Sequence, residues 1–331
     1  MGSKPKNMSA SRGAAVLGLN EWQSQWEIWQ IMKEELYPGF NKSKGYELPP
    51  PVDNASIRWG LAFEDSVIKL TELETDEKII DQERLYEKGN CTCHIDGMYL
   101  GSNTASRIHE GKTTSEFPYR KKWGEPGTSR VPGVYQVQTQ HQMYCTGADL
   151  DIVSVLVFPK APAEWEKEGI EVKNNPAGGW FLHTAENIIS LNDWASVLHQ
   201  MGYFHQYPVP RDDNAIKSML EGYEDFWNRY IIGGEEPIID RYDDIRRAFP
   251  EPVGTIICDP DFESMISEYG SIRNELGKSG PLSKRQTQLK TMILEKARFL
   301  DPVIDDESRD KTIFMSTEGK KLASFNGKVF R

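Results

Sequence analysis

Glu110 and Lys112 constrain the fold of this chain more than any other pair of residues. They lie two apart in a short strand-like stretch, Ile108-His109-Glu110-Gly111-Lys112. Successive side chains of a strand point to opposite faces of a sheet, so residues two apart share a face. We therefore expect Glu110 and Lys112 to face one site, with His109 and Gly111 on the other face.

A second carboxylate precedes this strand. Asp96-Gly97 ends an earlier strand-like stretch, and a hairpin turning near Gly101-Ser102-Asn103 would place Asp96 beside Glu110. Glu64 lies further upstream, on a predicted helix. Carboxylate oxygens are the ligands that Mg²⁺ and Mn²⁺ prefer, with other coordination positions left to water and phosphate. The sequence therefore predicts a Mg²⁺ site in which Mn²⁺ would substitute.

The Glu-x-Lys pattern alone is not specific, because it occurs three times in this chain. Glu171-Val172-Lys173 is also strand-like, with Asp149 and Asp151 upstream, and Glu318-Gly319-Lys320 is the third occurrence. Only Glu110-Gly111-Lys112 has an Asp-Gly before it, a helix glutamate earlier and a helix with Gln138-x-Gln140 after it. Without that context, Glu110 and Lys112 would be a surface ion pair worth at most about 1 kcal/mol.

Composition places the chain among ordinary globular proteins. With 331 residues, 38% hydrophobic and 27% charged, it can bury one large core, or one core with an appendage. No run approaches the roughly 18 apolar residues that span a bilayer, and the first residues lack the apolar stretch of a signal peptide. We expect no membrane association and a cytoplasmic location. The four cysteines form no C-x-x-C pair, so we expect reduced, partly buried thiols.

The net charge of −11 argues at first against a nucleic-acid partner, which needs clustered lysine and arginine. The local field matters more than the total. Cations follow the predicted site directly, at Arg120-Lys121-Lys122 and Arg130, and others lie near the N-terminus at Lys4, Lys6 and Arg12. The predicted DNA contacts among these cations are Arg12, Arg120, Lys121, Lys122 and Arg130.

The hydrophobic pattern predicts an α/β fold of the α+β type, with a central mixed sheet flanked by helices. We expect helices over 20–36, from about Ser56, and over 134–144, and a closing helix through Phe226-Trp227. We expect paired strands over 84–100 and 106–112, a loop over 113–133, and an interior strand over 151–158. Residues 159–200 have no clear pattern beyond a loop at 174–179.

The C-terminal part has a different character. Residues 261–276 and 281–300 predict two amphipathic helices that form an αα-hairpin, with apolar stripes Phe262/Ile266/Tyr269 and Leu282/Leu289/Met292/Phe299. A short strand pair follows around 312–330, with turns at Glu318-Gly319 and Asn326-Gly327. We therefore predict a domain over residues 1–240 and an appendage over residues 261–331.

Several motifs occur in a defined order along the chain. They are Ser9-Ala10-Ser11-Arg12 with Leu17-Gly18-Leu19, Trp59-Gly60 to Glu64, His94-Ile95-Asp96-Gly97, Glu110-Gly111-Lys112, and the stretch from Tyr135 to Gly147. This ordered set resembles the phage YqaJ/lambda-exonuclease family, the alkaline-exonuclease branch of the PD-(D/E)XK nucleases. The resemblance covers roughly residues 8–240 and implies a PD-(D/E)XK restriction-endonuclease-like core.

The resemblance implies a role for each matching residue. Asp96 and Glu110 match the metal-binding carboxylates, and Lys112 matches the catalytic lysine. Glu64 matches the helix glutamate, and Gln138 the glutamine near the attacking water. Two further matches concern the 5′-phosphate, which Ser11 would help to hold with Arg12 beside it. The chain departs from the family at Gly111, where an apolar residue is usual, and at Ile95, where proline is frequent.

These features together predict metal-assisted hydrolysis of a DNA phosphodiester. One or two Mg²⁺ ions would polarise the phosphate and lower the pKa of a water molecule. The metal ligands would be Asp96, Glu110, the carbonyl of Gly111, and Glu64. Lys112 would stabilise the developing charge and Gln138 would orient the nucleophile.

The family resemblance also implies a biological setting. It implies 5′→3′ digestion of linear double-stranded DNA to mononucleotides, which leaves a 3′ single strand for a phage single-strand annealing protein. It further implies a ring-shaped homotrimer around DNA. Two alternatives remain: a non-catalytic DNA-end-binding or assembly protein, and a PD-(D/E)XK nuclease with a restriction or CRISPR-adaptation role. Mg²⁺-dependent nucleotide release separates the binding protein from the nucleases.

Overall fold

The computed structural model describes residues 8–82, 84–100, 106–175, 179–248, 254–275, 281–300, 302, 311–326 and 330. The chain divides into two compact units, Met1–Leu19 with Pro51–Asp225, and Asn20–Pro50 with Phe226–Arg331. These units differ from the predicted division at residues 240 and 261, since residues 20–50 group with the C-terminal part. The division into a nuclease domain and an appendage stays a prediction.

The first unit holds the central sheet. Its elements are β1 (Met8–Ser9), α1 (Ala10–Val16), α4 (Ala55–Thr75), β2 (Ile79–Ile80), β3 (Leu85–Lys88), β4 (Cys91–His94), β5 (Gly97–Tyr99), β6 (Arg107–Ser115), α5 (Glu116–Lys122), α6 (Gly133–Thr146), β7 (Leu150–Phe158), α7 (Pro162–Lys167), β8 (Glu171–Asn175), β9 (Gly179–His183), β10 (Ile188–Ser190), α8 (Leu191–Gln200), β11 (Phe204–Pro210) and α9 (Asp213–Phe226).

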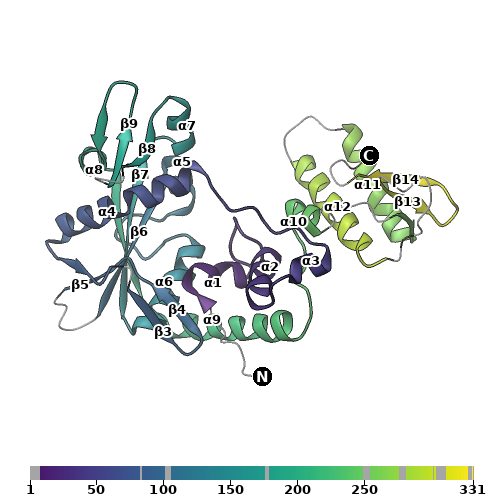
Figure 1. Ribbon diagram of the computed structural model, residues 1–331, viewed down its shortest axis with the longest axis horizontal. Helices are drawn as coiled ribbons and strands as arrows, with labels where there is room; N and C mark the ends of the chain where they lie inside the picture. Colours follow the sequence, from purple (N-terminus) through teal and green to yellow (C-terminus); the bar gives the residue numbers. More distant parts are fainter. Residues whose placement is uncertain are drawn as a thin grey trace. The chain divides into compact units, whose positions relative to one another are not determined.

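The central sheet has the strand order β11-β7-β6-β5-β2 (Figure 1). β6 and β7 pair in parallel, with Glu110 opposite Val153, and the other neighbours pair antiparallel. A parallel pair needs a crossover connection, which α5 and α6 supply between β6 and β7. β7 is almost continuously apolar and buried, as expected for an interior strand. The predicted strand, strand, helix, strand order and the mixed α/β class are confirmed.

Helix α4 covers one face of this sheet. The side chain of Asn54 caps the helix by accepting a backbone N–H of its first turn at 3.0 Å. Trp59, Phe63 and Val67 recur every four residues and are buried against the sheet and α8. Asp76 ends the helix in the left-handed conformation, with φ of 53°. The helix predicted from about Ser56 is therefore confirmed, and it fixes the side of the sheet on which Glu64 lies.

Two smaller sheets complete the first unit. β1, β4 and β3 form one, with β4 in the middle. β8, β9 and β10 form an antiparallel sheet within residues 159–200, where the sequence pattern gave no assignment. Trp165 of α7 and Trp194 of α8 lie 4.7 Å apart between ring centroids and pack on the main core. Residues 159–200 thus pack on the α4 side of the central sheet.

One predicted loop is mostly regular structure. Residues 113–115 extend β6, and Glu116–Lys122 form α5. The remaining stretch is held by backbone bonds, from Gly124 N–H to Arg130 O at 2.8 Å and from Gly127 N–H to Gln206 O at 2.9 Å. Tertiary contacts to β11 therefore order a segment whose polar, Gly- and Pro-containing composition favours a loop. The predicted turn at residues 101–103 lies outside the described residues.

The second unit contains the remaining elements. They are α2 (Gln25–Leu36), α3 (Phe40–Lys44), the π-helix η1 (Trp227–Ile232), α10 (Tyr242–Ala248), β12 (Thr255–Cys258), α11 (Pro260–Glu275), α12 (Pro281–Ala297), β13 (Thr312–Ser316) and β14 (Lys321–Phe325). In the segment predicted as a helix over 20–36, Trp26 and Trp29 are core residues, 0% and 1% exposed, whereas Trp22 precedes α2 and is 60% exposed. The predicted closing helix ends at Phe226 and continues as η1.

The predicted helical hairpin and strand pair are present in this unit. α11 packs against α12, and β13 pairs antiparallel with β14. β12, which the sequence pattern did not predict, adds a third strand parallel to β13. The apolar stripe predicted for this helix is wrong at Leu282, Met292 and Phe299, which are exposed, whereas Leu289 and Ile293 are buried. The helix therefore turns a different face to its neighbour than the spacing indicated.

Among the described helices, none has both the length and the apolar character needed to cross a membrane.

Candidate active site

Asp96 lies where the chain passes from one sheet to another. β4 belongs to the sheet with β1 and β3, and β5 belongs to the central sheet, so Ile95 and Asp96 form the connection. Gly97 follows at a position where only glycine fits, since a Cβ there would overlap the side chain of Ile79. Asp96 Oδ2 accepts the backbone N–H of Gly111 at 2.7 Å. This hydrogen bond places the Asp96 carboxyl directly beside β6, as the sequence predicted.

Successive side chains of β6 point to opposite faces of the sheet. Glu110 and Lys112 point to one face, where Lys112 Nζ forms an ion pair with Glu110 Oε1. His109 points to the α4 face, is fully buried, and has its Nε2 3.1 Å from the hydroxyl of Thr71. Burial lowers the pKa of His109 to about 3. His109 is thus a neutral core residue rather than a metal ligand.

A pocket of about 290 Å³ joins the predicted catalytic residues. Glu64 of α4 lines it together with Asp96, Glu110 and Lys112. Its lining is completed by Ile57, Gly60, Leu61, Val67, Gly111 and Thr113. The structure therefore brings four of the five predicted catalytic residues together in one pocket, although they are spread over 49 sequence positions from Glu64 to Lys112.

Helix α6 supplies two glutamines to the Glu110 carboxylate. Gln138 Nε2 donates to Oε1 at 2.6 Å, as expected for the residue that the sequence placed near the site. Gln142 Nε2 donates to Oε2 at 2.5 Å and to the carbonyl of His94 at 3.2 Å. Residues four apart share a helix face, so the spacing from Gln138 could have identified Gln142. The Gln138-x-Gln140 pattern directed attention to Gln140, which faces the other way.

The electrostatics of the pocket are those of crowded carboxylates. Burial, then Glu110 and more weakly Glu64, raise the pKa of Asp96 to about 7. Burial alone would lower the pKa of Lys112, but the attraction of Glu110 and Asp96 outweighs it and the pKa is raised. The site thus contains one firmly protonated lysine among more acidic groups than it can neutralise. Such a surplus of carboxylate favours a divalent cation.

Asp151 adds a carboxyl that the sequence pattern did not assign to the site. It lies on β7, is fully buried, and neither of its oxygens has a hydrogen-bond partner. Burial, then repulsion from Glu110 and Asp96, raise the pKa of Asp151 well above its usual value. An aspartate within the otherwise apolar stretch of residues 150–158 is the sequence feature that could have indicated a functional role for Asp151. Its proximity to Glu110 depends on the register of β6 and β7.

The carboxylates of the pocket are not arranged as a complete set of metal ligands. Within the described ranges, no group of three or more His, Cys, Asp and Glu side chains is arranged to hold a metal ion. The reason is visible at Glu110, whose oxygens are engaged by Lys112, Gln138 and Gln142. The donor atoms nevertheless suit Mg²⁺, because the pocket offers carboxylate oxygens from Asp96, Glu110 and Glu64.

The predicted DNA-binding residues lie outside this pocket. Ser11 and Arg12 are on α1, and the Ser11 hydroxyl lies 3.1 Å from that of Ser9. The basic residues of α5 and the loop after it are largely exposed: Arg120, Lys121, Lys122 and Arg130. Arg120 pairs with Glu116. Their contact with DNA stays a prediction.

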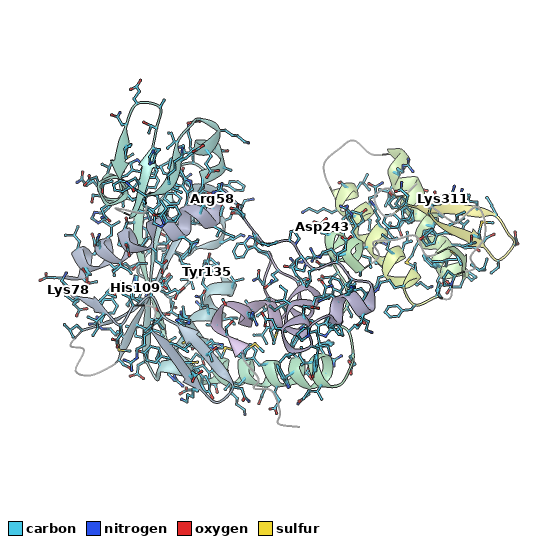
Figure 2. All side chains as sticks on the ribbon, viewed as in Figure 1. Arg58, Lys78, His109, Tyr135, Asp243 and Lys311 are labelled. Carbon is cyan, nitrogen blue, oxygen red and sulfur yellow. The ribbon has the colours of Figure 1, made fainter. Side chains whose placement is uncertain are left out.

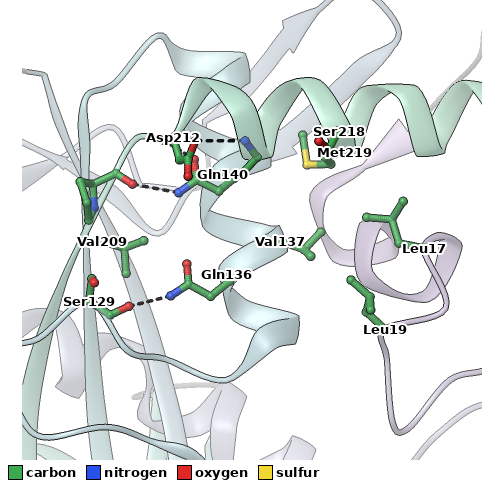
Figure 3. A pocket seen from close by; sticks show the side chains of 12 residues that line it. Leu17, Leu19, Ser129, Gln136, Val137, Gln140, Val209, Asp212, Ser218 and Met219 are labelled. Atoms are coloured by element: carbon green, nitrogen blue, oxygen red, sulfur yellow. Dashed lines mark hydrogen bonds between the residues drawn. The ribbon is translucent and has the colours of Figure 1, made fainter.

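The opposite face of α6 lines a second pocket, of about 510 Å³ (Figure 3). Gln140 Nε2 donates to Pro210 O at 2.9 Å and Gln140 Oε1 accepts from Asp212 N–H at 2.8 Å, which ties α6 to β11 and α9. Gln136 Nε2 donates to Ser129 O at 2.6 Å. Gln136 and Gln140 therefore anchor the helix, whereas Gln138 serves the active-site pocket.

The rival Glu-x-Lys occurrences have ordinary structural roles. Glu171 and Lys173 lie on β8, outside the central sheet, and form a solvent-exposed ion pair at 2.9 Å. Glu318-Gly319-Lys320 forms the turn between β13 and β14, where Gly319 has φ of 83°. Of the three occurrences, Glu110 and Lys112 are the pair that lines the pocket with Asp96 and Glu64.

The described residues thus form a mixed α/β fold in which α4 and α6 flank a central mixed sheet that carries an acidic pocket and a lysine. Residues 2–149 match the family model of the YqaJ-like viral recombinase domain. This match covers less than half of the chain and confirms, over that range, the resemblance seen in its motifs.

Known relatives are distant. The uncharacterized protein YqaJ of Bacillus subtilis (strain 168) is 22% identical over 238 residues, which cover 71% of this chain and 56% of that protein. The chain thus spans little more than half the length of this relative. Two solved structures are similar, each at 15% identity over 70% of this chain. They are the alkaline exonuclease LHK-Exo from Laribacter hongkongensis, covered to 91% with a TM-score of 0.42, and a phage-related exonuclease from Haemophilus somnus 129PT, covered to 98% with a TM-score of 0.41.

Proposed function

We propose that this protein is a Mg²⁺-dependent exonuclease that digests linear double-stranded DNA. The observation that carries the proposal is the pocket in which Asp96, Glu110 and Glu64 surround Lys112. Burial, and then the neighbouring Glu110, raise the pKa of Asp96 to about 7, as expected where a cation would balance the charge. The YqaJ-like viral recombinase domain over residues 2–149 supports a role in phage recombination.

The residues of the site suit phosphodiester hydrolysis. Mg²⁺ or Mn²⁺ held by Asp96, Glu110, Glu64 and the Gly111 carbonyl would supply Lewis-acid polarisation of the phosphate and an activated water. Lys112 holds a positive charge within the same pocket, where negative charge develops on the phosphoryl oxygens. Gln138 and Gln142 hold the Glu110 carboxylate through donated N–H groups and so fix its orientation.

The decisive experiment is digestion of linear duplex DNA carrying a distinguishable label at each 5′ and 3′ end. Wild type is assayed with Mg²⁺, with Mn²⁺ and with EDTA, beside Lys112→Ala and the matched variant Lys173→Ala. Lys173 belongs to the exposed Glu171–Lys173 pair, which has the same sequence spacing outside the site. We expect metal-dependent release of mononucleotides by wild type and Lys173→Ala, and a loss of at least about 100-fold in Lys112→Ala.

The same assay distinguishes the finer proposals. Early release of 5′ label indicates 5′→3′ digestion, and comparison of 5′-phosphorylated with 5′-hydroxyl ends tests the roles of Ser11 and Arg12. Cleavage of circular DNA would instead indicate a restriction-type or CRISPR-adaptation nuclease. DNA binding without cleavage in any metal would refute the enzyme and favour an end-binding protein. The engagement of Glu110 by Lys112 is the observation that favours that second candidate.

The proposed partners follow from the same function. A processive exonuclease that digests 5′→3′ would leave a 3′ single strand for a phage single-strand annealing protein. A homotrimeric ring would retain the DNA during digestion. Sedimentation of the protein alone and with duplex DNA tests the trimer. A monomer that still digests DNA processively would refute the ring.

A further inference from the structure

The ammonium of Lys112 contacts a carboxylate and an aromatic ring. The carboxylate oxygen is Glu110 Oε1, and the ring is that of Tyr135, whose centroid lies 5.1 Å from Nζ. Only 16% of the Lys112 side chain is exposed, so both contacts form largely out of water. A cation over an aromatic face is attracted by the ring quadrupole, and more strongly where it is desolvated.

The two partners differ in what else they must do. Glu110 already accepts N–H groups from Gln138 and Gln142 on its two oxygens. A divalent cation at this site would draw on the same oxygens as Lys112. The ring of Tyr135 offers a π-face, which binds an ammonium but is a poor ligand for Mg²⁺. Tyr135 can therefore hold Lys112 at the moment when Glu110 is shared with metal.

The ring of Tyr135 is itself held by neighbouring aromatic residues. Its centroid lies 5.6 Å from that of Trp123, and Trp123 lies 5.0 Å from Tyr207. Tyr207 is fully buried on β11, donates its hydroxyl to Gly124 O at 2.9 Å, and lies 2.7 Å from the hydroxyl of Tyr119. The ring is thus part of a packed aromatic wall, and Figure 2 places Tyr135 on the α6 side of the sheet that contains His109.

The position of Tyr135 on α6 fits this role. It lies three residues before Gln138 and seven before Gln142, so all three side chains share one helix face. One face of a single helix thus supplies an aromatic ring to Lys112 and two amides to Glu110.

We propose that Tyr135 is a positioning residue, whose ring holds the Lys112 ammonium in the active-site pocket when Glu110 binds metal. The inference rests on the proposed nuclease function for its catalytic consequence. The contact between Lys112 and the Tyr135 ring, on which the inference is built, can be measured without nuclease activity.

The first test is NMR of full-length protein with ¹³C at the lysine ε-carbon, with and without Mg²⁺. Ring currents shift a CH₂ over an aromatic face upfield, so the Lys112 ε-resonance, identified through Lys112→Arg, should lie upfield of exposed lysines in both conditions. Tyr135→Leu should return it to the exposed position, and Tyr135→Phe should not. Tyr144→Leu is the matched control, because Tyr144 lies on the same helix with Lys88 Nζ 4.7 Å from its ring centroid. It should move only the Lys88 resonance.

The second test is steady-state digestion of linear duplex DNA by the same variants. We expect Tyr135→Leu to lower kcat by about 3- to 30-fold with KM nearly unchanged, and Tyr135→Phe and Tyr144→Leu to match wild type. A lower kcat at unchanged KM in Tyr135→Leu, together with wild-type kcat in Tyr135→Phe, distinguishes positioning of Lys112 from a general loss of packing.

The outcomes separate this inference from the proposed function. A Lys112 resonance at the exposed position in Mg²⁺, or one unaffected by Tyr135→Leu, overturns the positioning role whatever the enzyme does. A lost shift with unchanged kcat also overturns it. Wild type that leaves DNA intact while the Lys112 shift follows Tyr135 as expected refutes the nuclease and confirms the contact.

Discussion

Replacing Asp96 with Asn tests the electrostatics of the pocket through protein stability. Burial and neighbouring carboxylates raise the pKa of Asp96 from 3.8 to about 7. Between these values the folded protein holds a proton that the unfolded chain has released. The free energy of unfolding of metal-free wild type therefore falls as pH rises from about 4 to about 7, and is level above that.

The size of the effect follows from the two pKa values. A rise from 3.8 to about 7 is roughly three pH units, which corresponds to about 4 kcal/mol above pH 7. Asp96 keeps some solvent contact, which reduces the effect. Asn retains an oxygen that accepts the Gly111 N–H, now at 2.7 Å. We therefore expect Asp96→Asn to stabilise the metal-free protein by about 2–4 kcal/mol at pH 8, and by close to nothing at pH 4.

The assay is urea-dependent hydrogen exchange of β6 amides in EDTA at several pH values, since these amides report on the unit that holds the site. Asp149→Asn, at an exposed aspartate before β7, is the control and should change nothing. Adding Mg²⁺ should stabilise wild type and leave Asp96→Asn little changed. A variant less stable than wild type at pH 8, or a difference that does not vary with pH, would refute the reasoning.

Three further changes test other contacts. Gln142→Leu removes a donor 2.5 Å from Glu110 Oε2 and should lower kcat about 10- to 100-fold with DNA affinity retained; an unchanged kcat in steady-state digestion would contradict this. His109 has a pKa lowered to about 3, so stability should be lost as pH falls from about 6.5 towards 3, and urea unfolding of His109→Asn should show a flatter acid slope. Gly13→Ala would place a Cβ against the hydroxyl of Tyr223 and should destabilise the protein by about 1–3 kcal/mol. Combining it with Tyr223→Phe should restore part of that stability. Strictly additive free-energy changes in urea unfolding would contradict the clash.

The parts of the site that sequence could predict are those set by local periodicity. The two-residue spacing of Glu110 and Lys112 settles their common face once the stretch is a strand, and β6 is one. The apolar run of residues 150–158 becomes β7 beside it for the same local reason. Asp96 was predictable because Asp-Gly marks a chain turn that a neighbouring strand can bring near.

The parts that sequence could not predict depend on contacts between distant segments. Gln138, Gln140 and Gln142 are chemically alike, and only the orientation of α6 against β6 and β11 decides which of them reach Glu110. The β6–β7 register brings Asp151 close enough to Glu110 for the two carboxyls to repel each other. Residues 113–133 contain turn-forming residues, yet bonds to β11 hold them in place.

Glu110 and Asp96 differ in the hydrogen-bond donors that they receive. Glu110 receives N–H groups from two amides and an ammonium, whereas Asp96 receives one backbone N–H. Burial, and then the neighbouring Glu110, raise the pKa of Asp96 to about 7. The proposed Mg²⁺ ligation would therefore release the proton of Asp96 at neutral pH, so we expect Mg²⁺ affinity to rise with pH up to about 7 and to level off above it. Gln140 ties α6 to Pro210 of β11 and to Asp212 just before α9, so contacts outside the pocket hold the helix that carries the donors of Glu110.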